Sequence, residues 1–365
     1  MFEFILRVYL SSYSKFRKAF TLPELLLGVF IALLLLGSLL SVLINLLIQE
    51  RNEQILTETQ QNMERAMRFM AEDIRQAVYV YDFQQTPSNT GSTGTYTNGK
   101  GLPYPLVGIP SGLIAANYIP IIAFWKITPL TDGVLTGLNC GALSNSSYIP
   151  ENNPQIANGA LSSQGECNAL LYRRKMMSLV VYFQKINAGD SSDSSWRGKS
   201  RILRYQFDKY NPSTTATSRN TGFVDPTYSS NYANWPENNS QTNLQSSLPT
   251  TTSNNLSVLL DYVDDPKSTV DTKFPACDSS QTRIPDNLST ASYSTSFYVC
   301  VTTLSAQSAQ GNWSSPAGQN QVVSIYLRGN AQGFPGLQVI TGTNNNVLAP
   351  LFTKVNIRGV INENY

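Results

Sequence analysis

The segment FTLPELLLGVFIALLLLGSLLSVLINLLI, residues 20–48, decides how the rest of the chain is organised. It carries no charge over residues 25–48, and about 20 consecutive apolar residues suffice to cross a bilayer as an α-helix. The sequence therefore predicts one membrane-spanning helix over residues 20–48. Glu24 is a carboxylate near its start. A charged side chain in a membrane helix costs about 2.5–3.5 kcal/mol at the bilayer centre, so Glu24 is expected to have a partner or a function.

The 19 residues before this segment form a short basic leader that ends in Lys15, Arg17 and Lys18. Positive charge on this side of a membrane helix predicts that the N-terminus stays in the cytoplasm and that the bulk of the chain lies outside. A cut between Ala19 and Phe20 would create an α-amino group with a pKa of about 8, roughly 6 Å along the helix from Glu24. Such an amine would be mostly cationic and could pair with a carboxylate of this kind.

Residues 18–26, KAFTLPELL, resemble the class III signal of type IV pilins and type II secretion pseudopilins. The resemblance implies that a prepilin peptidase cleaves between Ala19 and Phe20 and N-methylates Phe20. It also implies that Glu24 meets the amine of a neighbouring subunit and sets the register of assembly. Two positions depart from the family, since Ala19 replaces the usual Gly and Pro23 replaces Ile or Val. Proline in a first helical turn removes no hydrogen bond, because those N–H groups have no intrahelical partner.

The helix is predicted to continue as an amphipathic segment over residues 49–83, because no Pro or Gly occurs between Ser38 and Tyr81. Apolar residues recur there at spacings of three and four, with charged residues between them. Residues 65–77, RAMRFMAEDIRQA, resemble the corresponding helix of the PulJ and PilW branch of minor pilins and pseudopilins. Residues 20–26, FTLPELL, are also similar to cyanobacterial pseudopilins of hormogonium polysaccharide secretion. The apolar residues of the amphipathic segment can pack on the chain's own sheet, as the family implies.

Residues 84–365 are predicted to form an extracytoplasmic β-rich head, so the expected fold class is α+β. A long N-terminal helix would pack on an antiparallel sheet with long polar loops, in the manner of a pilin. Leu203, Tyr205 and Phe207 alternate with polar residues, which is typical of a half-buried strand. We expect loops over residues 84–112 and 211–255 and a short helix over 256–263. The expected strands are residues 118–127, 170–172, 179–185, 201–210, 296–304, 322–327 and 352–361.

The four cysteines all fall in the part predicted to lie outside the cytoplasm, where disulfides form, and four cysteines allow three connectivities. We expect Cys140 to pair with Cys167 and Cys277 with Cys300, because each pair closes a polar loop without crossing the other.

Composition argues against several kinds of function. The chain has no histidine, which removes Ser-His-Asp and Cys-His catalysis and histidine metal sites, so no enzyme activity and no cofactor are predicted. A formal charge of +2 gives no broad footprint for nucleic acid.

The acidic cluster of residues 261–271 is interpreted as a solvated turn, although it leaves calcium binding open, and Gly198-Lys199-Ser200 lacks the upstream glycine of a P-loop. Residues 173–175, RRK, fit a solvated turn about as well as an anionic partner.

Two functions remain. In the first, the chain is a minor pilin or pseudopilin, a structural subunit of a type IV pilus or a related secretion filament. Its partners would be the prepilin peptidase, other pilins through the N-terminal helix, the inner-membrane assembly platform and, before assembly, membrane lipid. It would move from the inner membrane to a periplasmic or cell-surface filament. In the second, the chain is an uncleaved membrane-anchored protein whose head binds glycan or a surface through Trp196, Trp235, Trp313 and its many tyrosines.

Overall fold

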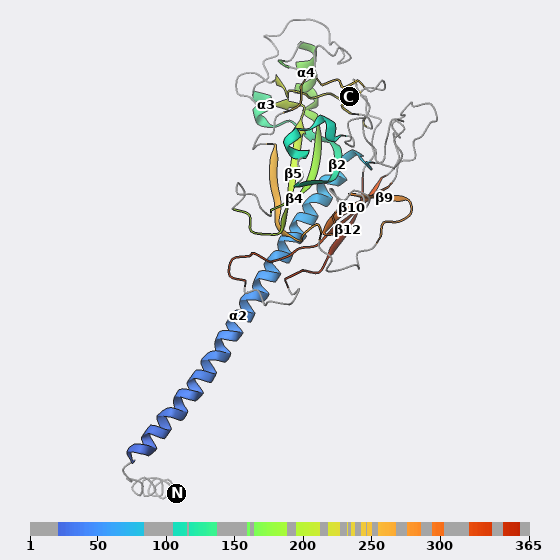
Figure 1. Cartoon of the computed structure of the whole chain (residues 1–365). Helices are drawn as coiled ribbons and strands as arrows, with labels where there is room; N and C mark the ends of the chain where they lie inside the picture. The colour runs from blue at the N-terminus through green and yellow to red at the C-terminus, as the bar shows by residue number, and fades with distance from the viewer. Residues whose placement is uncertain are drawn as a thin grey trace, which may run out of the picture. The chain divides into compact units, whose positions relative to one another are not determined.

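The computed structural model describes residues 21–83, 105–114, 117–136, 159–160, 164–187, 195–211, 218–226, 232, 235–237, 242–245, 247–249, 255–267, 276–285, 294–302, 321–337 and 346–357. It comprises two compact units, Met1–Gln54 and Ile55–Tyr365. The fold class is α+β, as predicted: a long N-terminal helix is followed by antiparallel sheets. Figure 1 shows the order of these elements along the chain.

Helix α2, Leu22–Arg75, is the longest described element. The carbonyl oxygen of Thr21 accepts the N–H groups of Glu24 at 3.0 Å and Leu25 at 3.2 Å, which fixes the first turn around Pro23. The prediction that the helix continues to residue 83 is wrong, since it ends at Arg75 and strand β1, Ala77–Val80, follows. Val78, Tyr79 and Val80 are β-branched or aromatic, and pairing with β2 outweighs the local helical pattern.

Two larger sheets build the second unit. The first has the order β1-β2-β4-β5-β8 and the second the order β12-β11-β10-β9, with antiparallel neighbours throughout. The first sheet adds β2 (Tyr118–Pro129), β4 (Lys175–Ile186), β5 (Ser200–Asp208) and β8 (Leu256–Val263) to β1. The second contains β9 (Gln281–Ile284), β10 (Phe297–Thr302), β11 (Val322–Leu327) and β12 (Leu351–Asn356). A small third sheet joins β3 (Gly159–Ala160), β7 (Ser218–Arg219) and β6 (Tyr210–Asn211).

The helical elements of the second unit beyond α2 are short. Those within the described residues are the 3-10 turns η1 (Leu106–Gly108) and η2 (Ser111–Ile114) and the α-helices α3 (Asp132–Thr136) and α4 (Gln164–Arg173). The strand expected over residues 170–172 is wrong because these residues belong to α4, where Cys167 and Leu170 share one buried face. The helix expected over residues 256–263 is also wrong. That segment is strand β8, which pairs with β5.

The remaining strand predictions are confirmed within a few residues by β2, β4, β5, β10 and β11. Of the last one, predicted over residues 352–361, β12 confirms residues 352–356; Ile357 lies outside the strand, and residues 358–361 lie outside the described part of the chain. The described part of residues 84–112, predicted as loop, contains the turn η1 and part of η2, and Leu106 and Ile109 are buried there.

The main core joins the last turns of α2 to both sheets. Met63, Met70 and Ile74 of the helix are at most 1% exposed, in one cluster with residues of all five strands of the first sheet and with β9 to β12. The helix approaches the chain at Gly329 so closely that a Cβ there would lie 2.3 Å from the Met63 sulfur. The amphipathic stripe of α2 therefore packs on the head of its own chain.

The opposite face of the first sheet buries a second core that is rich in aromatic residues. Trp125 of β2 and Trp235 pack edge to face with ring centroids 5.3 Å apart, and both are wholly buried. The Trp235 indole N–H donates to the Val224 carbonyl at 2.7 Å, while its ring contacts Gly108, where a Cβ would lie 2.5 Å from Cζ3. Trp235 in the polar 211–255 segment therefore anchors that segment to the sheet.

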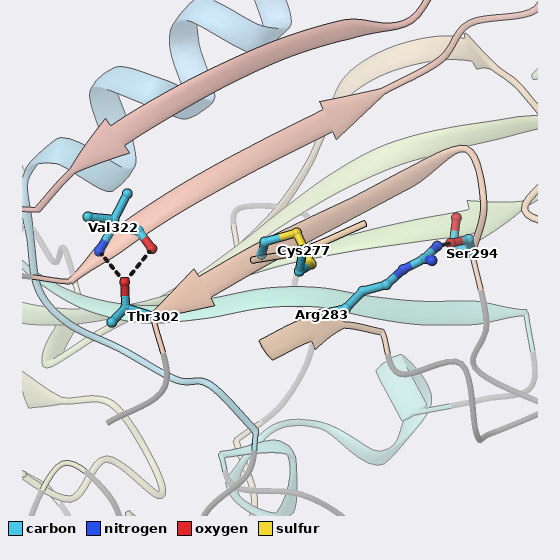
Figure 2. Close-up of a disulfide and its surroundings, with 6 residues drawn as sticks. Cys277, Arg283, Ser294, Thr302 and Val322 are labelled. Atoms are coloured by element: carbon cyan, nitrogen blue, oxygen red, sulfur yellow. Dashed lines mark hydrogen bonds between the residues drawn. A yellow bond between two sulfur atoms is a disulfide. The ribbon is translucent and has the colours of Figure 1, made fainter. Parts of the chain in front are cut away.

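Cys277 and Cys300 form a disulfide with their Cα atoms 5.5 Å apart, so this predicted pair is confirmed. Figure 2 shows it beside Arg283, which donates to the Ser294 carbonyl at 2.7 Å, and beside the Thr302–Val322 hydrogen bonds that join β10 to β11. Cys167 is fully buried, and its predicted partner Cys140 lies outside the described residues. The second pair therefore stays a prediction.

Candidate functional site

The first unit presents an uninterrupted apolar helix surface. Every residue from 21 to 47 is exposed, with Leu22 80% and Leu39 69% accessible, although most of them are hydrophobic. The helix is long and apolar enough to cross a membrane. Water does not favour a continuous apolar surface of this extent, because soluble proteins rarely expose patches beyond a few hundred Å². Such a surface is favourable where lipid or other apolar side chains cover it.

Glu24 lies in the first turn of this helix, two residues after its first residue, Leu22. The N-terminus of a helix carries partial positive charge, so a carboxylate there is favourable. The Glu24 carboxylate forms no ion pair within the described part of the chain. Ala19 and Phe20, the predicted cleavage and methylation positions, lie outside the described residues. The roles of all three residues stay predictions.

A buried charged cluster centred on Asp73 connects α2 to the first sheet. One carboxylate oxygen accepts from Lys126 Nζ at 2.6 Å, and the other accepts from Arg204 Nε at 2.8 Å and from the Tyr182 hydroxyl at 2.7 Å. Asp73 is 5% exposed, and its three partners come from β2, β5 and β4 in turn. One helical side chain therefore fixes the helix against three neighbouring strands.

The cluster sets the charge state of Asp73. Burial acts to raise the pKa of Asp73, but the hydrogen bonds and charges of Arg204 and Lys126 together outweigh it and lower that pKa. Burial first, and the nearby Asp73 charge second, raise the pKa of the Tyr182 hydroxyl, so Tyr182 stays neutral and donates. In the sequence, Asp73 is one of the charged residues between the apolar positions of the helix, and Arg204 is one of the polar residues that alternate with Leu203, Tyr205 and Phe207. The structure buries Asp73 and partly buries Arg204.

A second buried cluster connects the two larger sheets. Asp264 accepts from Arg328 Nε at 2.9 Å and from the Asn330 amide at 2.8 Å. The Gln184 amide donates to the hydroxyls of Ser200 and Ser296, both at 2.8 Å, so β4 is joined to the first residue of β5 and to the residue before β10. Asp264, which the sequence placed in a solvated acidic turn, is only 1% exposed and serves as a structural ion-pair partner. Asp271 of the same acidic stretch lies outside the described residues.

The tryptophans proposed for surface recognition have different environments. Trp235 is wholly buried, so it cannot contact a glycan in this fold. Trp196 is partly exposed, with the Arg201 guanidinium 5.1 Å from its ring centroid. Trp313 lies outside the described residues. The alternative function therefore loses one of its three tryptophans.

No family model, curated protein or solved structure matched the chain when it was compared with them. The assignment of function consequently depends on the residues and on the architecture. A long apolar N-terminal helix followed by an antiparallel sheet is compatible with a pilin-like architecture.

Proposed function

We propose that the chain is a minor pilin or pseudopilin, a structural subunit that a prepilin peptidase processes before Phe20 and that polymerises through its N-terminal helix. The observation that carries this proposal is the exposed apolar helix itself. The helix begins at Leu22, the third residue after the proposed cut, and carries Glu24 in its first turn. Its residues 22–47 are all exposed, and the helix continues to Arg75. The last turns of the same helix pack into the core of the head.

The proposed mechanism follows from what covers this helix in each state. Before assembly, residues 25–48 lie in the inner membrane, since their length exceeds the roughly 20 residues that span a bilayer. After extraction, the same surface is buried against the equivalent segments of other subunits. Full burial of a large apolar side chain contributes about 1.5–3 kcal/mol, so the 19 apolar residues of this segment supply most of the affinity. The pairing of Glu24 with a neighbouring amine sets register, because misplaced subunits would strand a buried charge.

The size of the head and its polar insertions support a minor subunit rather than the major one. Segments such as residues 211–255 are long and rich in Ser, Thr and Asn. Long polar loops pack poorly in a repeating lattice and are common sites of interaction.

The experiment is to recover sheared surface filaments from cells that express the tagged full chain and to detect it by immunoblot. The proposal predicts the chain in the filament fraction of wild-type cells and only in the membrane fraction of cells that lack the assembly platform. A membrane protein released by cell damage serves as the control for contamination. Equal recovery of the chain from both strains, at the level of that control, would refute filament incorporation.

A further inference from the structure

One exposed surface of the head combines positive charge with an aromatic ring. Leu171, Tyr172, Arg173, Arg174 and Lys175, called the α4 patch below, are consecutive and all exposed. Tyr172 is 91% exposed and Leu171 39%. The patch covers the last residues of α4 and the first residue of β4, near α3 in Figure 1.

The backbone of the patch is held by buried neighbours on both sides. Cys167 and Leu170 of α4 and Met176 of β4 belong to a compact apolar cluster. The Arg174 N–H donates to the Leu170 carbonyl and the Arg174 carbonyl accepts from the Leu130 N–H, both at 2.9 Å. The exposed side chains therefore project from a fixed base, which reduces the entropy lost when a ligand binds.

Arg174 has a backbone conformation that favours other residues. Its φ is 50°, in the left-handed region, at the position after a helix where glycine or asparagine is usual. Glycine or asparagine could form the same backbone hydrogen bonds at a lower conformational cost than arginine. Strain of this kind is common at ligand sites, where the side chain is retained for what it contacts.

The three cations are available to a ligand. None of Arg173, Arg174 and Lys175 forms an ion pair in the part of the chain that the structure describes. The carbonyl end of α4 carries partial negative charge, which favours one cation nearby. It does not explain why three cations lie together beside an exposed tyrosine. The patch is thus a local excess of positive charge in a chain with 26 basic and 24 acidic residues.

We propose that the α4 patch binds an acidic polysaccharide of the polyuronate class. The guanidinium groups of Arg173 and Arg174 match carboxylates in bidentate geometry, and Lys175 adds a third cation. The exposed Tyr172 ring offers a flat apolar surface to the ring faces of a sugar, and Leu171 extends it. Polyuronates carry both carboxylates and sugar rings along one chain. The proposal does not depend on cleavage before Phe20 or on filament assembly.

Other anionic partners fit less well. Nucleic-acid binding usually depends on a basic surface that extends over a whole face of the protein, and this chain is close to neutral. A membrane-surface helix needs an apolar face along its length, whereas the buried residues Cys167 and Leu170 commit that face of α4 to the core. An acidic peptide would use the cations but not the exposed ring.

The test measures binding of polygalacturonate to the full chain in nanodiscs of zwitterionic lipid. The comparison polymers are neutral dextran, polyglutamate and a single-stranded oligonucleotide of similar charge. The variant R173Q/R174N/K175Q removes three charges while asparagine keeps the left-handed conformation. The matched control K199Q/K267Q/K354Q removes three exposed charges elsewhere, and the fluorescence of the buried tryptophans verifies folding. A separate variant, Tyr172→Ala, removes the ring alone.

We expect the patch variant to raise the Kd for polygalacturonate about tenfold and the control variant to change it less than about twofold. Tyr172→Ala should raise that Kd about fivefold and leave the weaker binding of polyglutamate unchanged. Equal losses in the two triple variants, or no binding by wild type, would overturn the site. Oligonucleotide or polyglutamate binding as tight as that of polygalacturonate, with no effect of Tyr172→Ala, would overturn the polysaccharide assignment.

Discussion

Replacing Asp73 by alanine is expected to lower the free energy of unfolding of the head by about 3–5 kcal/mol. The reason is that Lys126 and Arg204 would keep their charges at positions where their side chains are only 10% and 12% exposed. The Asp73 carboxylate, which accepts hydrogen bonds from three strands of the first sheet, would no longer hold α2 to that sheet. The measurement is urea unfolding of the full chain in non-ionic detergent, followed by the fluorescence of the buried Trp125 and Trp235.

Glu72→Ala is the matched control for this substitution. Glu72 is the preceding residue on the same helix, carries the same charge and is exposed. We expect its replacement to change the unfolding free energy by less than about 0.5 kcal/mol. If the two variants were equally stable, the Asp73 cluster would contribute nothing specific to the packing of α2 on the sheet.

The same cluster predicts a loss of stability in acid. Because the pKa of Asp73 in the folded chain is lowered, its contribution is present above its unfolded pKa of about 3.9 and is lost as the pH falls through the folded value. Burial raises the pKa of Asp261, which affects the pH dependence of stability in the opposite direction. Asp261 is present in wild type and in the variant Asp73→Asn, so its effect cancels when the two are compared. The difference in stability between wild type and Asp73→Asn should therefore be constant from about pH 5 to 7 and shrink below about pH 4. A difference that stays constant down to pH 2 would contradict this assignment.

Replacing Glu24 by alanine is expected to leave cleavage before Phe20 intact and to reduce recovery of the chain in sheared filaments by about tenfold or more. The pairing of a buried carboxylate with the amine of a neighbour is worth several kcal/mol when one partner is removed, and 1.4 kcal/mol corresponds to a factor of ten. The readout is an immunoblot of the filament and membrane fractions, with the N-terminal mass measured in each.

The matched control is Glu64→Ala, which removes one exposed carboxylate from the same helix outside its apolar segment. It should leave filament recovery within about twofold of wild type. Normal incorporation of Glu24→Ala would refute the register function of Glu24. If both variants reduced filament recovery to a similar extent, the effect would come from the charge of the helix and not from the position of Glu24.

The features that the sequence predicted correctly are those encoded locally. An apolar run of more than 20 residues indicates a helix by composition alone, and alternation in residues 201–208 indicates a strand by its period of two. The pairing of Cys277 with Cys300, only 23 residues apart, is likewise local enough to infer.

The features that sequence reasoning missed depend on distant partners. Residues 256–263, LSVLLDYV, contain apolar residues compatible with either helix or strand, and the antiparallel pairing with β5 decides between them. Asp73 resembles its solvated neighbours in the helix, yet its partner Arg204 lies 131 positions away. The same holds for Trp235, whose burial depends on contacts with Gly108 and with the Trp125 ring. No local pattern carries such information.

The most direct measurement is the N-terminal mass of the chain isolated from cells with and without prepilin peptidase. We expect a mature chain that begins at N-methylated Phe20 only when the peptidase is present. A chain that retains residues 1–19 in both strains would contradict it, because Glu24 would then have no N-terminal amine to meet in a neighbouring subunit. The chain would in that case be an uncleaved membrane-anchored protein.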